Sequence, residues 1–361
     1  MTAVHGGPVR GVGAAACLTT FALAGIGTVL TTRFFLASAG YPKLGGGGHL
    51  HIAHMLWGGL LMAAAVLLAV VFLGRAARLG AAVTGGVGFG LFIDEIGKQI
   101  TDEPGYFYRP AAGLIYASFV LLVLLARLVH HRSRRAPLTA RERTANAADL
   151  ALTGVTSGLT AEQRQDALRL VGDSSDEVDR ALAGLLAALP ERAPGPASRL
   201  RRTLTRTERT LRGIARSRPA VTVAVLWVVI EAVVLVLWVG ISFLSGGLDG
   251  DPQQGASAGI LASAALGGTF GVLGLVRLLR PAEGGDPARP YRLLRYALLT
   301  DILCGQIFKF TVNQFAAVTE LALDLALLWI VTTAVDRRTR QVRPPLTASS
   351  VAAPSAAARA S

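Results

Sequence analysis

Two neighbouring apolar runs of the chain carry the residues whose types and spacing best fit metal chemistry. His49, His51 and His54 lie close together at the start of one run, and Asp94 and Glu95 lie near the end of the next. Imidazole and carboxylate groups are costly to bury in a bilayer, so they are usually paired and functional there. They are also ligands for zinc, iron and manganese. The sequence therefore predicts a divalent-metal site, most simply for zinc, formed by the three histidines and Asp94.

Two further residues have predicted catalytic roles beside this metal. Glu95 could act as a general base for a metal-bound water, and Lys98 could pair with Asp94 or stabilise an oxyanion. Arg33, near the end of the first apolar run, is another counter-ion for Asp94. These roles indicate a metal-dependent hydrolase or a lipid-modifying enzyme. The alternative for the same residues is a set of solvated or mutually hydrogen-bonded polar groups at a membrane boundary.

Small residues predict which helices approach one another. Gly86 and Gly90 precede Asp94 at intervals of four residues, so the three share one helical face. Such small residues allow a neighbouring helix to approach closely. Gly58, in the preceding run, would make that run the neighbour, and Asp94 would then face the histidines.

Acidic residues in other apolar runs favour a different function. Carboxylates inside a membrane are typical of proton or ion relays, and four occur here: Glu231, Asp301, Glu320 and Asp324. Glu320 and Asp324 are one helical turn apart, and their repulsion calls for a proton or a cation. Lys309 could pair with one of them only if two helices fold back closely. An ion- or proton-coupled transporter is therefore the alternative to the enzyme, and a non-catalytic membrane scaffold is a third hypothesis.

The composition is that of a protein that crosses a membrane several times. The chain has 361 residues, 52% of them hydrophobic, and a mean hydropathy of +0.49. A bilayer requires roughly 20 apolar residues per helix, and eight runs meet this: 14–37, 50–73, 79–100, 110–130, 220–244, 257–279, 291–310 and 314–335. A short polar patch separates the last two, where one bent helix is the alternative. We expect an all-α integral membrane bundle of about eight transmembrane helices.

The charge distribution predicts how these helices are oriented. The net charge of +13 does not indicate nucleic-acid binding, because the arginines gather in loops that fall on one side of the predicted bundle. Such residues stay on the cytoplasmic side, so we expect a multi-pass bacterial plasma-membrane protein with both termini in the cytoplasm. Arg75 and Arg78 are expected in a loop between the second and third runs. The first run is long enough to span and is expected to be an uncleaved helix.

Four parts are expected along the chain. They are a first membrane half with the metal site, a cytoplasmic helical insertion, a second membrane half and a disordered tail, at 1–130, 131–219, 220–340 and 341–361 respectively. In the insertion, capping boxes that begin at Thr160 and Ser174 predict two short helices, which end near Gly172 and at Pro190. The segment 198–218 predicts a basic amphipathic helix that binds anionic lipids of the inner leaflet. A solvated tether is its alternative.

Short matches between the membrane halves indicate an internal repeat. At a nearly constant offset, the matching segments are 56–59 with 265–268 and 96–98 with 307–309. Both halves begin on the same side, so the repeat would be a parallel one of four plus four helices. His54 and Asp94 then fall opposite Ser263 and Gly305, which leaves the predicted metal ligands in the first half alone.

One stretch of sequence also resembles a known family. Gly48-His-Leu-His-Ile-Ala-His-Met-Leu-Trp-Gly-Gly59, followed by Gly88-Phe-Gly-Leu-Phe-Ile-Asp-Glu95, is similar to a family of actinobacterial polytopic membrane proteins without a known activity. The resemblance covers the second to fourth runs best and implies a polytopic fold. Membrane hydrolases that hold zinc with three histidines and an aspartate use similar ligand types. Their histidines are split between two helices, however, so that analogy concerns site chemistry alone.

Overall fold

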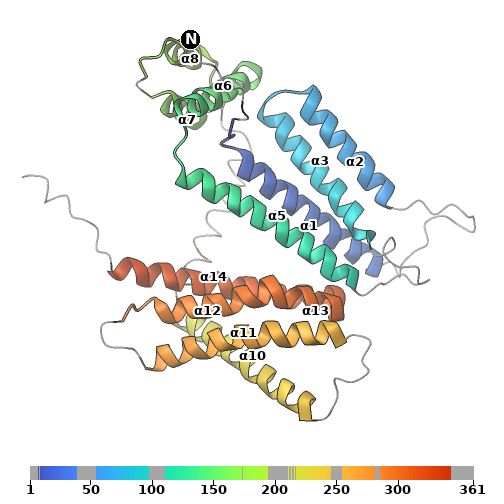
Figure 1. The fold of residues 1–361 in the computed structure, drawn as a ribbon. Coiled ribbons are helices and arrows are strands. Elements are labelled where there is room, and N and C mark those ends of the chain that lie inside the picture. The colour runs from blue at the N-terminus through green and yellow to red at the C-terminus, as the bar shows by residue number, and fades with distance from the viewer. Residues whose placement is uncertain are drawn as a thin grey trace, which may run out of the picture. The chain divides into compact units, whose positions relative to one another are not determined.

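The described part of the chain is helical throughout its regular elements. The computed structural model describes residues 7, 9–38, 54–96, 110–172, 174–193, 210, 213, 215, 217–244, 254–280 and 285–342. Apart from one isolated bridge between Leu159 and Glu191, each regular element in these ranges is a helix (Figure 1). The chain divides into two compact units, Met1–Thr203 and Leu204–Ser361. The predicted all-α fold class is confirmed.

Unit 1 contains four long apolar helices. They are α1 (Ala14–Ser38), α2 (His54–Val71), α3 (Gly74–Asp94) and α5 (Pro110–Arg135). Helix α3 packs against both α1 and α2, and α5 packs against α1 (Figure 1). All four are long and apolar enough to cross a membrane. The runs predicted at these positions therefore form helices.

Helix α3 begins earlier than expected. Only Phe72 and Leu73 join α2 to α3. Gly74 has a φ of 90°, a conformation that glycine adopts without steric cost, so the chain reverses at once. The prediction that Arg75 and Arg78 lie in a loop is therefore wrong, because both belong to the first turns of α3.

Glycines on two faces of α3 bring its neighbours close. Gly86 and Gly90 face α1, and a Cβ atom at Gly90 would lie 2.6 Å from the carbonyl oxygen of Gly25. Gly88 faces α2, where a Cβ atom would lie 2.7 Å from the carbonyl oxygen of Gly58. The prediction that α2 is the neighbour of the Gly86/Gly90 face is wrong, because α1 occupies that face.

A small three-helix domain follows α5. Helices α6 (Ala140–Ser157), α7 (Ala161–Val171) and α8 (Glu177–Ala188) enclose a core of their own. The predicted capping box of Thr160 and Gln163 is confirmed, as is the helix end at Gly172. The predicted cap at Ser174 is wrong. Asp176 caps α8 instead, because its carboxylate already accepts the free amide of the first turn.

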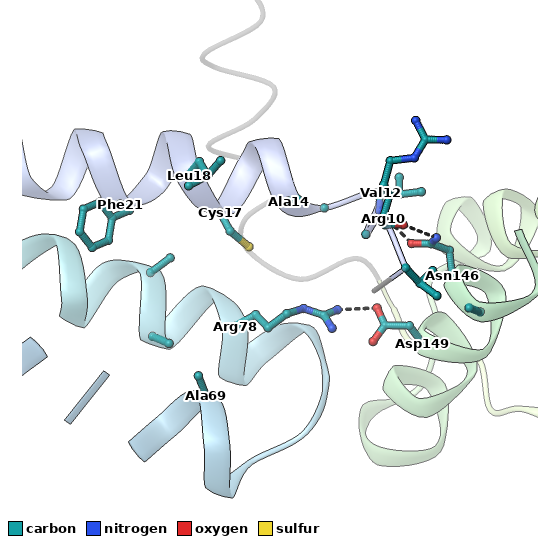
Figure 2. Close-up of a pocket in the computed structure, with 16 residues that line it drawn as sticks. Arg10, Val12, Ala14, Cys17, Leu18, Phe21, Ala69, Arg78, Asn146 and Asp149 are labelled. Atoms are coloured by element: carbon teal, nitrogen blue, oxygen red, sulfur yellow. Dashed lines mark hydrogen bonds and ion pairs between the residues drawn. The ribbon is translucent and has the colours of Figure 1, made fainter. Parts of the chain in front are cut away.

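Charged pairs connect α6 to the membrane helices of unit 1. The Nε of Arg10, which precedes α1, donates to the Glu142 Oε1 at 2.6 Å. Arg78 of α3 forms an ion pair with Asp149 of α6 (Figure 2). The hydrogen bond from Arg10 lowers the pKa of Glu142 from 4.5 to about 2. The domain is thus held at two points.

Asn146 of α6 forms hydrogen bonds with the backbone just before α1. Its Oδ1 accepts from the amide of Val12 at 2.8 Å, and its Nδ2 donates to the carbonyl of Arg10 at 2.8 Å (Figure 2). These residues border a cavity of about 590 Å³ between α1, α3 and α6. The α6–α8 domain is therefore docked by specific hydrogen bonds as well as by charge.

Unit 2 is a second helical bundle. Its helices are α10 (Arg218–Leu244), α11 (Gln254–Leu279), α12 (Arg289–Thr300), α13 (Gln306–Asn313) and α14 (Ala317–Val342). Helix α11 packs against α10 and α12, and α14 packs against α12 and α10. Their shared core is apolar and includes Val228, Leu294, Leu298 and Val331. This core carries the polar cluster described below.

The last two predicted runs are separate helices. Helix α13 ends at Asn313, and a single turn, Gln314–Ala316, precedes α14. Gln314 has a φ of 52°, so the helical path is broken there. The prediction of two helices rather than one bent helix is confirmed.

Six helices in the described ranges are long and apolar enough to cross a membrane: α1, α2, α3, α5, α11 and α14. The chain is therefore a polytopic membrane protein. The predicted count of eight also needs α10 and the α12–α13 segment, and it stays a prediction.

Candidate functional site

The end of α3 and the start of α2 bring together part of the predicted metal site. The amide of Met55 donates to the Glu95 Oε2 at 2.7 Å, and the His54 Nδ1 lies 3.6 Å from the Glu95 Oε1. Glu95 is 4% exposed. A helix N-terminus favours a carboxylate through its free amides and its dipole, so the start of α2 holds Glu95 beside His54.

Asp94 meets α1 instead. The Arg33 Nε donates to the Asp94 Oδ1 at 2.6 Å, and its Nη2 donates to the Asp94 backbone carbonyl at 2.9 Å. Successive helical residues point about 100° apart, because the helix has 3.6 residues per turn. Asp94 and Glu95 therefore contact different helices. Asp94 lies on the Gly86/Gly90 face, which α1 covers. The predicted pairing of Arg33 with Asp94 is confirmed.

The remaining predicted ligands lie outside the described residues. These are His49 and His51, together with the predicted catalytic residue Lys98. The structure gives His54 a contact with Glu95 and gives Asp94 an ion pair with Arg33. The three-histidine zinc site therefore stays a prediction.

A larger polar group lies inside the bundle of unit 2. Lys309 of α13 is its centre. The Lys309 Nζ lies 2.9 Å from the Asp301 Oδ1 and 3.3 Å from the Glu231 Oε1, and it also contacts Glu320. These partners come from the turn before α13, from α10 and from the first turn of α14. The predicted pairing of Lys309 with an acid of α14 is confirmed, because α13 and α14 fold back on each other.

Asp324 and Gln306 extend this group into the core. The Gln306 Nε2 donates to the Asp324 Oδ2 at 2.7 Å and to the Asp301 Oδ2 at 3.4 Å. Asp324 is 1% exposed and Gln306 is fully buried. The Asp324 Oδ1 and the Gln306 Oε1 have no hydrogen-bond partner among the described residues. We call Lys309, Gln306 and the four carboxylates of Glu231, Asp301, Glu320 and Asp324 the Lys309 cluster.

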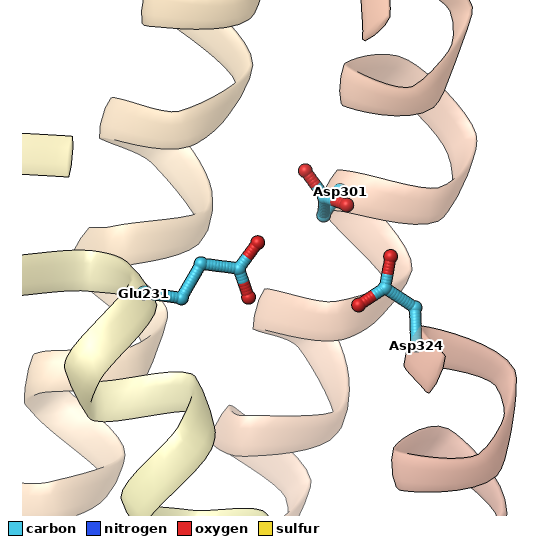
Figure 3. A group of neighbouring side chains, drawn as sticks. All are labelled: Glu231, Asp301 and Asp324. Carbon is cyan, nitrogen blue, oxygen red and sulfur yellow. The ribbon is translucent and has the colours of Figure 1, made fainter. Parts of the chain in front are cut away.

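Three of these carboxylates converge. Figure 3 shows the side chains of Glu231, Asp301 and Asp324 turned toward one another from separate helical segments. One oxygen atom of each lies within 4.8 Å of the others. Carboxylate oxygens so arranged could hold a metal ion.

The cluster carries more negative than positive charge. Lys309 is the one cation that the described residues bring to four carboxylates. If all four were ionised, three negative charges would be in excess. Charges inside a bilayer are costly unless they are paired, so this arrangement calls for protons or a bound cation.

The cluster is open on one side and closed on the other. The side chains of Glu231 and Glu320 are 34% and 36% exposed, whereas that of Lys309 is 12% exposed. Glu231, Asp301, Lys309 and Glu320 border a cavity of about 480 Å³, which is otherwise lined mainly by small and apolar residues of α10, α11 and α12. Exposure therefore falls from the cavity toward Asp324.

A widened turn positions Asp301. Residues Asp301–Gly305 form a π-helical turn between α12 and α13, and such turns occur frequently at functional sites. Gly305 leaves room for the Asp301 carboxylate, because a Cβ atom at Gly305 would meet that carboxylate and lie 3.1 Å from the Ser263 Oγ. The acids and Lys309 were predictable from the sequence. The part played by Gln306 was signalled only by an amide in an apolar helix.

Comparisons with known proteins found no match for this chain. No family model matches the chain, and neither the curated proteins nor the solved structures contain a significant match. The fold and the site together define a polytopic helical membrane protein with a cluster of acids arranged so that it could hold a metal ion.

Proposed function

We propose that this protein moves protons or cations across the membrane through the Lys309 cluster. The observation that carries this proposal is four carboxylates around one lysine inside a membrane-protein bundle. Ionisable groups at such positions mark ion and proton pathways. The fall in exposure from Glu231 and Glu320 to Asp324 supports a path that leads from the cavity inward.

The chemistry of Gln306 fits such a path. Its Nε2 donates to the Asp324 Oδ2 at 2.7 Å, a hydrogen bond that suits an ionised carboxylate. After rotation by half a turn, the amide oxygen would accept a hydrogen bond from the protonated acid, since an amide offers both donor and acceptor. Gln306 can therefore offer Asp324 one hydrogen bond in either protonation state without movement of its helix. A relay group needs that property.

The test is flux through purified protein in liposomes. Under an imposed pH gradient or membrane potential, we expect proton or cation flux above that of empty liposomes, and Asp301→Asn should abolish it. Asp286→Asn is the matched control. Asp286 lies before α12 and pairs with Arg292 outside the cluster, so flux should persist. No flux through the wild-type protein, or equal flux through both variants, would overturn the proposal.

The internal repeat is part of the proposal. In unit 1, a Cβ atom at Gly58 would touch the carbonyl of Gly88, and in unit 2 one at Gly267 would lie 3.3 Å from the carbonyl of Ala297. The same number of residues separates Gly58 from Gly267 and Gly88 from Ala297. This shared contact supports a parallel repeat in which α2 and α3 correspond to α11 and α12. An eight-span topology in a bacterial plasma membrane, with both termini cytoplasmic and 198–218 on anionic inner-leaflet lipids, completes the proposal.

A metal-dependent hydrolase is the second candidate. The observation that favours it is the contact between His54 and Glu95, which places an imidazole beside an anchored carboxylate. Zinc held by His49, His51, His54 and Asp94 would supply an activated water, with Glu95 as its base. Metal analysis of purified protein tests this. Stoichiometric zinc should disappear in the His51→Ala/His54→Ala variant, and a metal-free wild type would exclude the enzyme.

A further inference from the structure

The acceptor atoms at the closed side of the Lys309 cluster point to a particular kind of ligand. The Asp324 Oδ1 and the Gln306 Oε1 are buried and have no hydrogen-bond partner among the described residues. The amide oxygen of Gln306 only accepts hydrogen bonds, and so does the Asp324 Oδ1 while that carboxylate is ionised. A buried polar atom that lacks its partner is costly. The missing partner must therefore be electropositive.

We propose that Glu231, Asp301 and Asp324 form a site for a hard divalent cation, and that Lys309 is a tethered cation that competes for it. This inference rests on the proposed function and names its ligand. Hard divalent ions prefer carboxylate and amide oxygens, and the three carboxylates already converge (Figure 3). The Gln306 Oε1 adds an amide oxygen beside Asp324.

Lys309 shares its partners with the proposed ion. Its ammonium lies against Asp301 and Glu231, which are two of the three converging acids, and it also contacts Glu320. A dication that binds both shared acids repels the ammonium. Glu320 is not one of the three proposed ligands and is more exposed, so Lys309 keeps a partner when it withdraws. Lys309 thus occupies the site when the ion is absent and leaves it when the ion enters.

This competition makes a prediction opposite to that of a structural role. If Lys309 only held the acids in position, its removal would disorder the site and weaken ion binding. If it competes with the ion, its removal should tighten binding by at least about tenfold, because a positive charge a few ångströms from a dication is strongly repulsive even when screened.

The experiment measures Mn²⁺ binding to the full-length protein in detergent, by the loss of the free-ion signal in electron paramagnetic resonance. We expect saturable binding to the wild type and at least about tenfold tighter binding to Lys309→Met. Asp324→Asn should weaken binding by at least about tenfold. Asp286→Asn should leave the affinity unchanged. The His51→Ala/His54→Ala variant should also retain it, which separates this site from any metal held by histidines in unit 1.

A second variant guards against a failure of Lys309→Met to fold. Lys309→Met/Glu320→Gln removes the tethered cation and one acid together, so the net charge of the cluster stays that of the wild type and the three proposed ligands are intact. It should also bind Mn²⁺ more tightly than the wild type. Unchanged or weaker binding in this variant would overturn the proposal, as would an Asp324→Asn variant with wild-type affinity. Proton flux without Mn²⁺ binding would overturn this inference alone and leave the proposed function standing.

Discussion

The buried pair between Arg33 and Asp94 allows a direct test of how unit 1 is held together. The side chain of Asp94 is 4% exposed and that of Arg33 is 16% exposed. Arg33→Leu places an apolar side chain at this position of α1 and leaves the Asp94 carboxylate without this partner. Breaking a buried ion pair from one side typically costs about 3–5 kcal/mol. We therefore expect the free energy of unfolding to fall by about 3–5 kcal/mol.

The assay is unfolding of the detergent-purified protein by titration with SDS, followed by circular dichroism. Arg78→Leu is the matched control, since Arg78 also belongs to a membrane helix and forms an ion pair, with Asp149. That pair is much more exposed, at 51% and 31%, and exposed pairs contribute only about 0–1 kcal/mol. Arg33→Leu/Asp94→Leu should restore most of the lost stability, because replacing both partners by apolar groups is often neutral.

One result would refute this reasoning. If Arg33→Leu destabilised the protein no more than Arg78→Leu, the Asp94 charge would be compensated by another group. Zinc bound to the histidines and Asp94 would do this, as the sequence alone predicts. The variant therefore distinguishes an ion pair from a metal ligand at Asp94.

Three other changes have defined outcomes. Gly58→Leu should destabilise the detergent-purified protein by about 1–3 kcal/mol through overpacking, because its Cβ atom would lie 2.7 Å from the backbone of α3, whereas Gly59→Leu has nothing within 4 Å and should be tolerated; equal effects would contradict the α2–α3 contact. Asn146→Ala should cost about 1–3 kcal/mol in the same assay, since two part-buried hydrogen bonds to the backbone of Arg10 and Val12 are lost, each typically contributing about 0.5–1.5 kcal/mol, and an unchanged stability would show that the N-terminal segment is not docked. The pKa of Glu142 is lowered from 4.5 to about 2 by Arg10, so the pair stabilises the fold at neutral pH and loses this effect as the pH falls from 4.5 toward 2. A spin label near the N-terminus should become mobile over that range. In the Glu142→Gln variant the label should be mobile at every pH, and an immobile label there would refute the role of the pair.

The membrane helices were the most predictable part of the fold. Within the described residues, each predicted run overlaps a helical segment, because a long apolar run leaves the backbone no partner but itself in a membrane. The start of α3 was predicted wrongly, since Arg75 and Arg78 resemble loop residues. The reversal depends on the backbone of Gly74, whose φ a sequence does not show.

The helices outside the membrane were less predictable. Helix α6 escaped prediction because its buried face is built from Ala147 and Ala151, which give a weak hydrophobic signal. Its capping box was nevertheless present in the sequence as Thr139 and Glu142. In this domain, capping signals therefore indicated the helix starts better than the periodicity of apolar residues did.

The polar residues were predictable by type but not by partner. The sequence pointed to Asp94 and Glu95 as one group, yet adjacent positions on a helix face different neighbours. The glycine face with Asp94 could pack against α1 or α2, and nothing in the spacing decides between two glycine-bearing neighbours. The involvement of Lys309 was predicted only on condition that α13 and α14 fold back. The positive φ of Gln314 breaks the helix between α13 and α14 and lets them fold back on each other.

The two units differ in how their buried charges are compensated, and this difference decides where function is best sought. In unit 1, Asp94 has Arg33, and Glu95 has His54 and the amide of Met55. In unit 2, three acids share Lys309, and the deepest acid, Asp324, is bonded to Gln306 and has one oxygen without a partner among the described residues. A purely structural network has no reason to retain an uncompensated buried acid, because apolar residues would stabilise the same bundle at least as well. The excess charge of unit 2 therefore argues for a ligand that arrives and leaves, whereas the paired charges of unit 1 are sufficient for a scaffold.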